Sequence, residues 1–233
     1  MNSLSDTLAW PARDSQWVSK ILVMGLIGLL ALVPVVGTVI VALVYLGWVF
    51  SAIDNLRAGR YELPPAGFGY LGRGGPPFLV LVVYGLVVAV LFVVFYVPGI
   101  VLLGVGGSDH GPGALAGLGA LLIALGLAVG FVGGLGLGLL HPVILRRTYY
   151  WGIGGGLDFR AVISEVRARP GDTLLCGVFA IIALLIGQLG SALCIVGVIF
   201  TQPYGYAMLA GVVRYYDQTV SGTEPGQSGY AIT

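Results

Sequence analysis

Charged residues are scarce in this sequence. Aspartate, glutamate, lysine and arginine make up 9% of its 233 residues, while hydrophobic residues make up 58%; a soluble domain carries about 25% charged residues. A surface so poor in charge would aggregate in water, but lipid requires none. The net charge of +1 points to neither a nucleic acid nor an acidic partner. The composition therefore argues against a soluble domain and predicts an integral membrane protein.

Cysteine and histidine are also scarce, with two residues of each. We expect Cys176 and Cys194 at opposite ends of one membrane helix, too far apart for a disulfide. His110 and His141 lack further ligands at metal spacing. The sequence shows no Ser-His-Asp arrangement, carboxylate pair or Cys-His cluster. It therefore predicts no catalytic site, no bound metal and no cofactor.

Long apolar runs dominate the chain instead. The first covers 18–53, and one straight helix of that length would reach about 54 Å, far beyond a hydrocarbon core of about 30 Å. Pro34 and Gly37 in its middle are typical of a turn. We therefore favour two short helices, at 18–33 and 36–56, over the alternative of a single kinked and tilted helix.

Four more spans and one shorter helix follow. The spans are predicted at 78–105, 113–145, 173–190 and 195–216, and all six form one membrane domain over 18–217, between a cytoplasmic N-terminal segment, 1–17, and a polar C-terminal tail, 218–233. In 158–169, apolar side chains recur at helical spacing opposite arginines, and twelve residues are too few to cross a bilayer. We predict an amphipathic helix at the membrane interface, with Arg160, Arg167 and Arg169 at the membrane surface.

The positive charges predict the orientation. Lysines and arginines occur before the first predicted span, between the second and third, between the fourth and fifth, and at the end of the sixth. The opposite connectors, around Pro34, Asp109 and Ser191, carry none. Positive residues are retained on the cytoplasmic side, so both termini are expected there. The predicted fold is an all-α integral membrane protein with six transmembrane helices in three hairpins and one cytoplasmic interfacial helix.

One predicted span carries a regular row of glycines. They recur four apart, at Gly126, Gly130, Gly134 and Gly138. This spacing puts them on one helix face, where a neighbouring backbone can approach closely. We interpret the row as packing between spans of the same chain; an oligomer interface or a pore lining is the functional alternative.

The deepest strongly polar side chains are expected in the last hairpin. They are Gln188 and Gln202, with Tyr204 and Tyr206 near the second. These side chains could line a polar path for a substrate, but hydrogen bonds between helices are the plainer use. No Asp, Glu, Lys or Arg is expected at membrane depth, where ion-coupled transporters usually hold one.

Several short motifs resemble those of a known family. They are DSQWVSK at 14–20, PVVG at 34–37, YELP at 61–64, LDFR at 157–160, RPGD at 169–172 and CIVGVIFTQPYGY at 194–206. Their order and spacing resemble those in the membrane protein family called domain of unknown function 4013. The similarity covers most of 8–217. The resemblance implies a multi-pass protein of a prokaryotic plasma (inner) membrane and brings no established activity. The Gly- and Pro-rich segment 65–77 departs from the acidic, tryptophan-containing segment of family members.

Two functions of different classes are consistent with this sequence. The leading hypothesis is a non-catalytic accessory or scaffold subunit that packs against partner membrane proteins. The expected contacts of the chain are membrane lipids and either a partner membrane protein or, as an alternative to it, a homo-oligomer. The alternative is a passive transporter or channel for small solutes or lipids, using the polar side chains of the last hairpin. An enzyme ranks third, because only a hidden cofactor would supply the missing chemistry.

Overall fold

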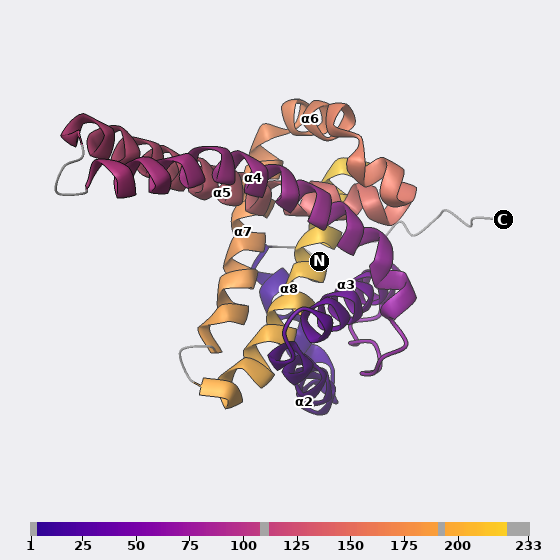
Figure 1. Cartoon of the computed structure of the whole chain (residues 1–233). Coiled ribbons are helices and arrows are strands. Elements are labelled where there is room, and N and C mark those ends of the chain that lie inside the picture. Colours follow the sequence, from indigo (N-terminus) through magenta and orange to yellow (C-terminus); the bar gives the residue numbers. More distant parts are fainter. Residues whose placement is uncertain (1–3, 108–111, 191–193, 223–233) are drawn as a thin grey trace. The chain divides into compact units, whose positions relative to one another are not determined.

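The computed structural model describes residues 4–107, 112–190 and 194–222, and all regular structure in them is helical (Figure 1). In chain order the helices are α1 (Leu4–Ala9), η1 (Trp10–Arg13), α2 (Trp17–Gly28), η2 (Leu29–Leu32), α3 (Val36–Arg57), α4 (Leu71–Gly106), α5 (Gly113–Leu157), α6 (Phe159–Ala168), α7 (Pro170–Leu189) and α8 (Cys194–Ser221), where η marks a 3-10 helix. The predicted all-α class is confirmed for this part of the chain.

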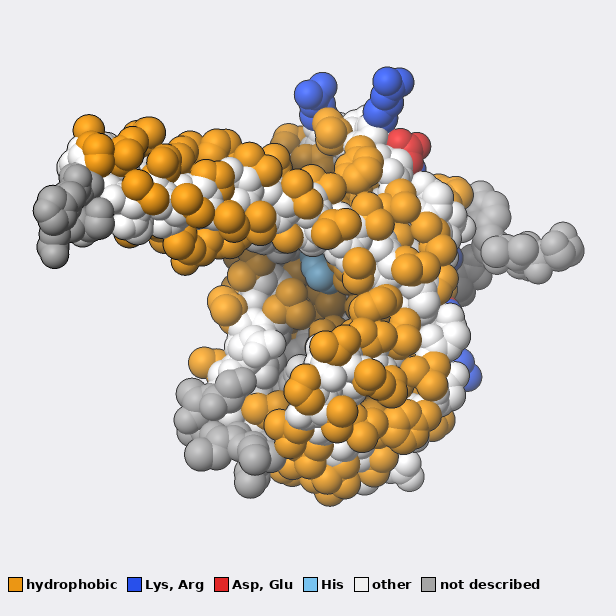
Figure 2. Space-filling model, viewed as in Figure 1, with side chains coloured by type: hydrophobic (Ala, Val, Ile, Leu, Met, Phe, Trp, Pro, Cys, Tyr) orange, Lys and Arg blue, Asp and Glu red, His pale blue; other side chains and the backbone are white. Residues whose placement is uncertain are grey.

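Several helices are long and apolar enough to cross a membrane. They are α3, α4, α5 and α7, and the bent pair formed by α1–η1 and α2–η2 would make a fifth span. α8 is 28 residues long and covers the predicted sixth span. Hydrophobic side chains cover most of the visible surface in the space-filling view (Figure 2). The helices are therefore compatible with a multi-pass membrane protein.

The chain divides into two compact units, of which the first holds residues 1–80 and 139–233. α8 forms the centre of this unit, because it contacts α1, η1, α2, α3 and α7. Its residues Leu209 and Val212 are completely inaccessible. A Cβ atom at Gly205 of α8 would lie 2.6 Å from a carbonyl oxygen of α7, so the two backbones are in direct contact. The first unit is thus assembled around α8.

The N-terminal helices α1 and η1 pack on α8. Trp10 is fully buried, and its indole N–H donates to the Ala207 carbonyl oxygen, 3.0 Å away. In the other direction, the Tyr204 hydroxyl of α8 donates to the Leu8 carbonyl oxygen at 3.1 Å. The segment before the first predicted span is therefore part of the packed interior, a role that its polar composition does not reveal.

The chain reverses direction between η2 and α3. The Tyr45 hydroxyl of α3 donates to the Met24 carbonyl oxygen of α2, 3.0 Å away, so these helices run side by side. At the turn, a Cβ atom at Gly37 would collide with the Leu30 carbonyl group, which only glycine avoids. Residues 18–56 thus form two helical segments joined by a tight turn that contains Pro34.

A clamp around Asp14 and Lys20 holds the connection between α3 and α4. The Asp14 carboxylate accepts the Leu63 backbone N–H at 2.8 Å and pairs with the Lys20 ammonium at 2.7 Å. Lys20 also donates to the Leu63 carbonyl oxygen at 2.7 Å. Burial alone would raise the pKa of Asp14, but hydrogen bonds from Lys20 and from the backbone N–H groups of Gln16 and Leu63 lower it below its ordinary value. The clamp therefore favours the charged carboxylate.

α4 begins at Leu71, earlier than the predicted start at 78, and includes Pro76 and Pro77. This first part of α4 packs directly on α3, because a Cβ atom at Gly74 would lie 2.6 Å from the backbone carbonyl carbon of Leu43. The tertiary contact outweighs the local preference of proline against a helix interior.

α5 continues past its predicted end at 145 and is broken at Gly152. This glycine has a φ of 63° and a ψ of −154°, a combination that is essentially restricted to glycine. Beyond the break, a Cβ atom at Gly156 would lie 2.8 Å from the Val80 side chain. The glycine-rich segment thus makes a compact turn before α6.

The second unit, residues 81–138, is a hairpin formed by parts of α4 and α5. We call it the α4–α5 hairpin. A Cβ atom at Gly119 would lie 2.7 Å from the Gly99 carbonyl oxygen, and one at Gly106 would collide with the backbone of Ala116. In each helix, 11% of the most apolar stretch is buried. Each helix therefore presents one face to its neighbour and leaves most of its surface open.

We predict that Gly74→Ala destabilises the protein, whereas Gly75→Ala does not. The new methyl group at position 74 would collide with the backbone of Leu43, while no atom lies within 4 Å of the one at position 75. Overpacking costs about 1–3 kcal/mol, and alanine suits a helix interior better than glycine. Thermal unfolding of both purified variants in one detergent measures the difference. An unchanged midpoint for Gly74→Ala would contradict the contact between α3 and α4.

Candidate functional site

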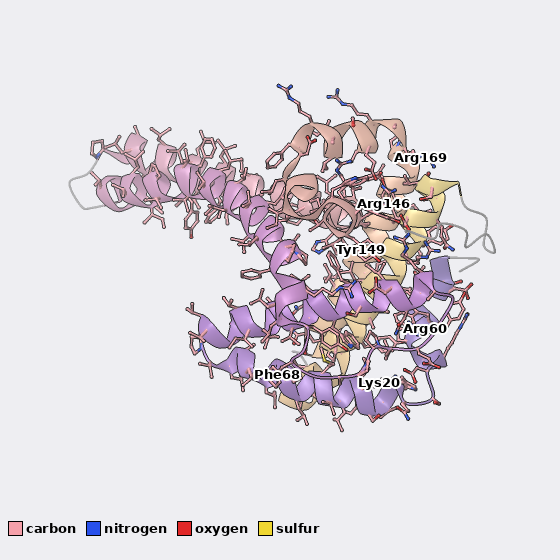
Figure 3. The ribbon with its side chains drawn as sticks, turned by 90° about the vertical axis from the view of Figure 1, so that its right-hand side faces the viewer. Lys20, Arg60, Phe68, Arg146, Tyr149 and Arg169 are labelled. Atoms are coloured by element: carbon pink, nitrogen blue, oxygen red, sulfur yellow. The ribbon has the colours of Figure 1, made fainter. Side chains whose placement is uncertain are left out.

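A group of charged side chains connects α5, α6 and α8 in the first unit. Arg146 lies on α5 (Figure 3), and its guanidinium binds Asp217 of α8 at 2.9 Å and Glu165 of α6 at 3.0 Å. The side chains of Arg146 and Asp217 are 10% and 5% exposed. An unpaired charge in such a buried position is costly, so these three side chains depend on one another.

Asp217 accepts hydrogen bonds from three side chains. Besides Arg146, its partners are Arg214 of its own helix at 2.9 Å and the Tyr150 hydroxyl at 2.9 Å. Glu165 is likewise shared, because Arg147 binds its second oxygen at 3.3 Å. The two carboxylates are thus saturated by groups from α5 and α8.

Tyrosines extend this group to α3. The Tyr149 hydroxyl donates to Asp54 at 2.5 Å, and Arg73 pairs with the same carboxylate at 2.5 Å. The guanidinium of Arg57 lies 5.5 Å and 4.8 Å from the ring centroids of Tyr149 and Tyr150, in cation–π contact. We call the whole set the charge cluster: Asp54, Arg57, Arg73, Arg146, Arg147, Tyr149, Tyr150, Glu165, Arg214 and Asp217.

The charge cluster contains oppositely charged side chains that pair across helices. Guanidinium groups stay protonated, and each of the three carboxylates is paired with at least one arginine. The arrangement therefore ties α3, α4, α5, α6 and α8 to one another.

Sequence reasoning did not bring these residues together. Arg146 and Asp217 are 71 positions apart, and the sequence identifies Arg146 only as a positive charge that follows an apolar run. A usable signal exists, because Asp54 and Asp217 each stand at the end of a long apolar run. An acid in that position needs a basic or hydrogen-bonding partner.

The four glycines of the predicted row do not all contact α4 in the structure. Gly126 and Gly130 face α4, since a Cβ atom at either would lie 3.1 Å from the nearest α4 atom. At Gly134 no atom lies within 4 Å, and the contact passes to Gly133 instead; Gly138 is half-buried. Each step of four residues turns about 40° beyond one full helical turn, so a row spaced by four drifts off the contact face.

The four polar side chains predicted in the last hairpin differ in their exposure and in their contacts. Gln188 is exposed, whereas Gln202 is half-buried beside α2. Tyr204 donates to a carbonyl oxygen of α1. The Tyr206 ring packs edge-on against Tyr45, with 5.0 Å between the ring centroids. Tyr204 thus forms a hydrogen bond between helices, whereas Tyr206 makes a ring contact between helices.

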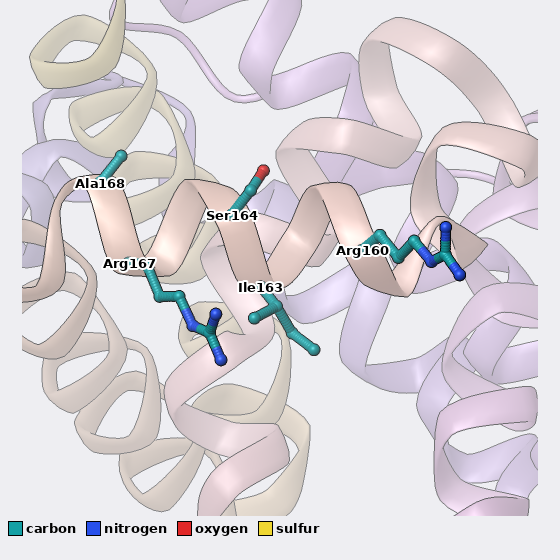
Figure 4. A pocket seen from close by; sticks show the side chains of 5 residues that line it. All are labelled: Arg160, Ile163, Ser164, Arg167 and Ala168. Carbon is teal, nitrogen blue, oxygen red and sulfur yellow. The ribbon is translucent and has the colours of Figure 1, made fainter.

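The three predicted surface arginines differ in their contacts. Arg160 and Arg167 of α6 are exposed and border a shallow hollow of about 670 Å³ (Figure 4). Arg169 follows α6 and donates a hydrogen bond to the Thr219 carbonyl oxygen near the end of α8. Arg169 is therefore engaged within the first unit.

Histidine and cysteine positions offer no metal site in the described part of the chain. Within 4–107, 112–190 and 194–222, no group of three or more His, Cys, Asp or Glu residues is placed to hold a metal ion. His141 lies on α5, and His110 lies outside the described residues. Cys176 lies on α7 while Cys194 begins α8. The expectation that both cysteines share one helix is wrong, because α7 ends at Leu189.

A family model matches most of the chain. The family is described as "Protein of unknown function (DUF4013)", and its model matches residues 26–196. No curated protein and no solved structure matches the chain. Two motifs within the matched range have structural roles. Asp158 caps α6 by accepting the Ala161 backbone N–H at 3.0 Å, and Pro170 begins α7, a position that suits proline.

We predict that Asp217→Asn strongly destabilises the protein. The change removes the carboxylate shared by Arg146 and Arg214, and loss of one partner from a buried ion pair costs about 3–5 kcal/mol. Asp6→Asn is the matched control, because the Asp6–Arg13 pair is more exposed and surface pairs contribute about 0–1 kcal/mol. Thermal unfolding in detergent compares the two variants. Equal midpoints would contradict the role assigned to the charge cluster.

Proposed function

We propose that this chain, which belongs to the DUF4013 family of proteins of unknown function, is a non-catalytic accessory or scaffold subunit of a membrane protein complex. The family description assigns no activity, so the proposal rests on the contacts and surfaces of the chain itself. The charge cluster is occupied with contacts between helices, while apolar outer surfaces are open to lipid and to protein partners.

We further propose six membrane spans, with both termini on the cytoplasmic side of a prokaryotic plasma membrane. α2 with η2, together with α8, would add two spans to the four long apolar helices. The positions of Lys and Arg support the orientation. In a background without native cysteines, a cysteine at Arg60 or at Arg160 should react with an impermeant thiol reagent from the cytoplasmic side alone. Labelling from the outer side would overturn the orientation.

The proposal of a partner protein rests on glycines that lie on open faces of the α4–α5 hairpin. No atom lies within 4 Å of a Cβ atom at Gly85, Gly104, Gly117, Gly134 or Gly136. Glycine weakens a helix by about 0.5–1 kcal/mol relative to alanine, and contacts within the hairpin do not explain these positions. In membrane helices, small residues let another helix pack closely. A partner helix seated on the hairpin would account for them.

The alternative, a passive transporter or channel, has less support. Tyr204 and Tyr206, which would belong to its polar path, bond to or pack against other helices of the first unit. Gln188 is exposed, whereas Gln202 is half-buried and turned toward α2. We therefore place the accessory role first.

Gentle extraction of the tagged protein from its native membrane, followed by native mass determination, tests the accessory role. We expect a second chain in a fixed ratio. Gly134→Leu adds a side chain on an open face and should release that second chain without lowering the unfolding temperature of the isolated protein. Leu135→Ile, at a neighbouring residue that is 46% exposed, is the control and should leave the complex intact. A monomer, or a homo-oligomer alone, would count against the accessory role.

A further inference from the structure

The outer face of α6 presents two arginines around a shallow hollow (Figure 4). The hollow is lined by Arg160, Ile163, Ser164, Arg167 and Ala168. Arg160 and Arg167 stand seven residues apart, which is about 10 Å along the helix axis. Long arginine side chains at this spacing can contact two neighbouring acidic groups, or approach one group from both sides.

The acids of the same helical segment do not neutralise these arginines. Glu165 lies on the inner side of α6, where it binds two arginines of α5. Asp158 caps the first turn of the helix. Among the described residues, neither Arg160 nor Arg167 forms an ion pair. The outer face therefore carries two positive charges that no ion pair among the described residues neutralises.

An apolar strip runs beside the two arginines. Phe159 and Ile163 are 43% and 49% exposed and lie one helical turn apart, whereas Val162 is buried on the inner side. An exposed apolar strip next to a basic row is typical of a helix in the headgroup region, where apolar side chains reach the acyl boundary and long cationic side chains reach the phosphates. An acidic protein segment would need the arginines but not the strip.

We propose that this face of α6 binds the headgroups of anionic phospholipids. Arg160 and Arg167 contact the lipid phosphates, and Ile163 rests against the acyl chains. α6 connects α5 to α7, both long and apolar enough to cross a membrane, so a bilayer surface would lie close to it. Arg169 is not part of this site, because it is bonded to α8. The inference does not depend on the accessory role.

Lipid binding to the full-length protein in detergent, measured by native mass spectrometry, tests this site. Phosphatidylglycerol serves as the anionic probe and phosphatidylcholine as the neutral one. Each arginine near an anionic lipid surface strengthens binding about five-fold. The double variant Arg160→Gln/Arg167→Gln is therefore expected to bind phosphatidylglycerol about 30-fold more weakly, with phosphatidylcholine binding unchanged.

The matched control is Arg13→Gln/Arg60→Gln, which removes the same charge from exposed positions outside α6. It should retain phosphatidylglycerol binding close to that of the wild type. The proposal is overturned if this control loses as much binding as the α6 variant, because net charge would then explain the effect. It is equally overturned if the α6 variant binds phosphatidylglycerol as the wild type does.

Discussion

Direct contact between helix backbones at glycines sets the distances between helices, and the ion pairs of the fold depend on those distances. Gly74 of α4 meets Leu43 of α3, and Gly177 of α7 meets Leu139 of α5. A side chain at either glycine would force the helices apart. Arg146 spans from α5 to α6 and α8 through hydrogen bonds of ordinary length, which separated helices would not permit. The ion pairs between large charged side chains therefore depend on the close packing of the helices at small residues.

Such close packing also constrains the buried polar groups. Buried polar groups need partners within the chain, because little room is left for water between touching helices. The Asp14 clamp, the Asp217 carboxylate and the Tyr45 hydroxyl all meet this need internally. Two surfaces remain that the contacts within their own units do not explain: the open glycine faces of the α4–α5 hairpin and the basic face of α6.

Features that arise from local periodicity could be predicted from the sequence, whereas contacts between distant residues could not. Apolar runs located the long helices, and the helical spacing in α6 identified an apolar side on which Val162 is buried. The pairing of Asp14 with Leu63 spans 49 positions, and nothing near either residue specifies the other. The glycine row could be predicted only in part. Its spacing indicated a packing face, but a row spaced by four residues drifts around the helix, so Gly133 rather than Gly134 makes the contact with α4.

The proposed accessory role requires that another protein cover the α4–α5 hairpin in the membrane. Phe131 of this hairpin is 73% exposed, so a photoreactive phenylalanine analogue at this position would report what lies against it in the intact native membrane. We expect a covalent product with one defined protein, the same chain that accompanies the extracted complex. Products with lipid alone would contradict the claim that the hairpin is a surface for a partner protein.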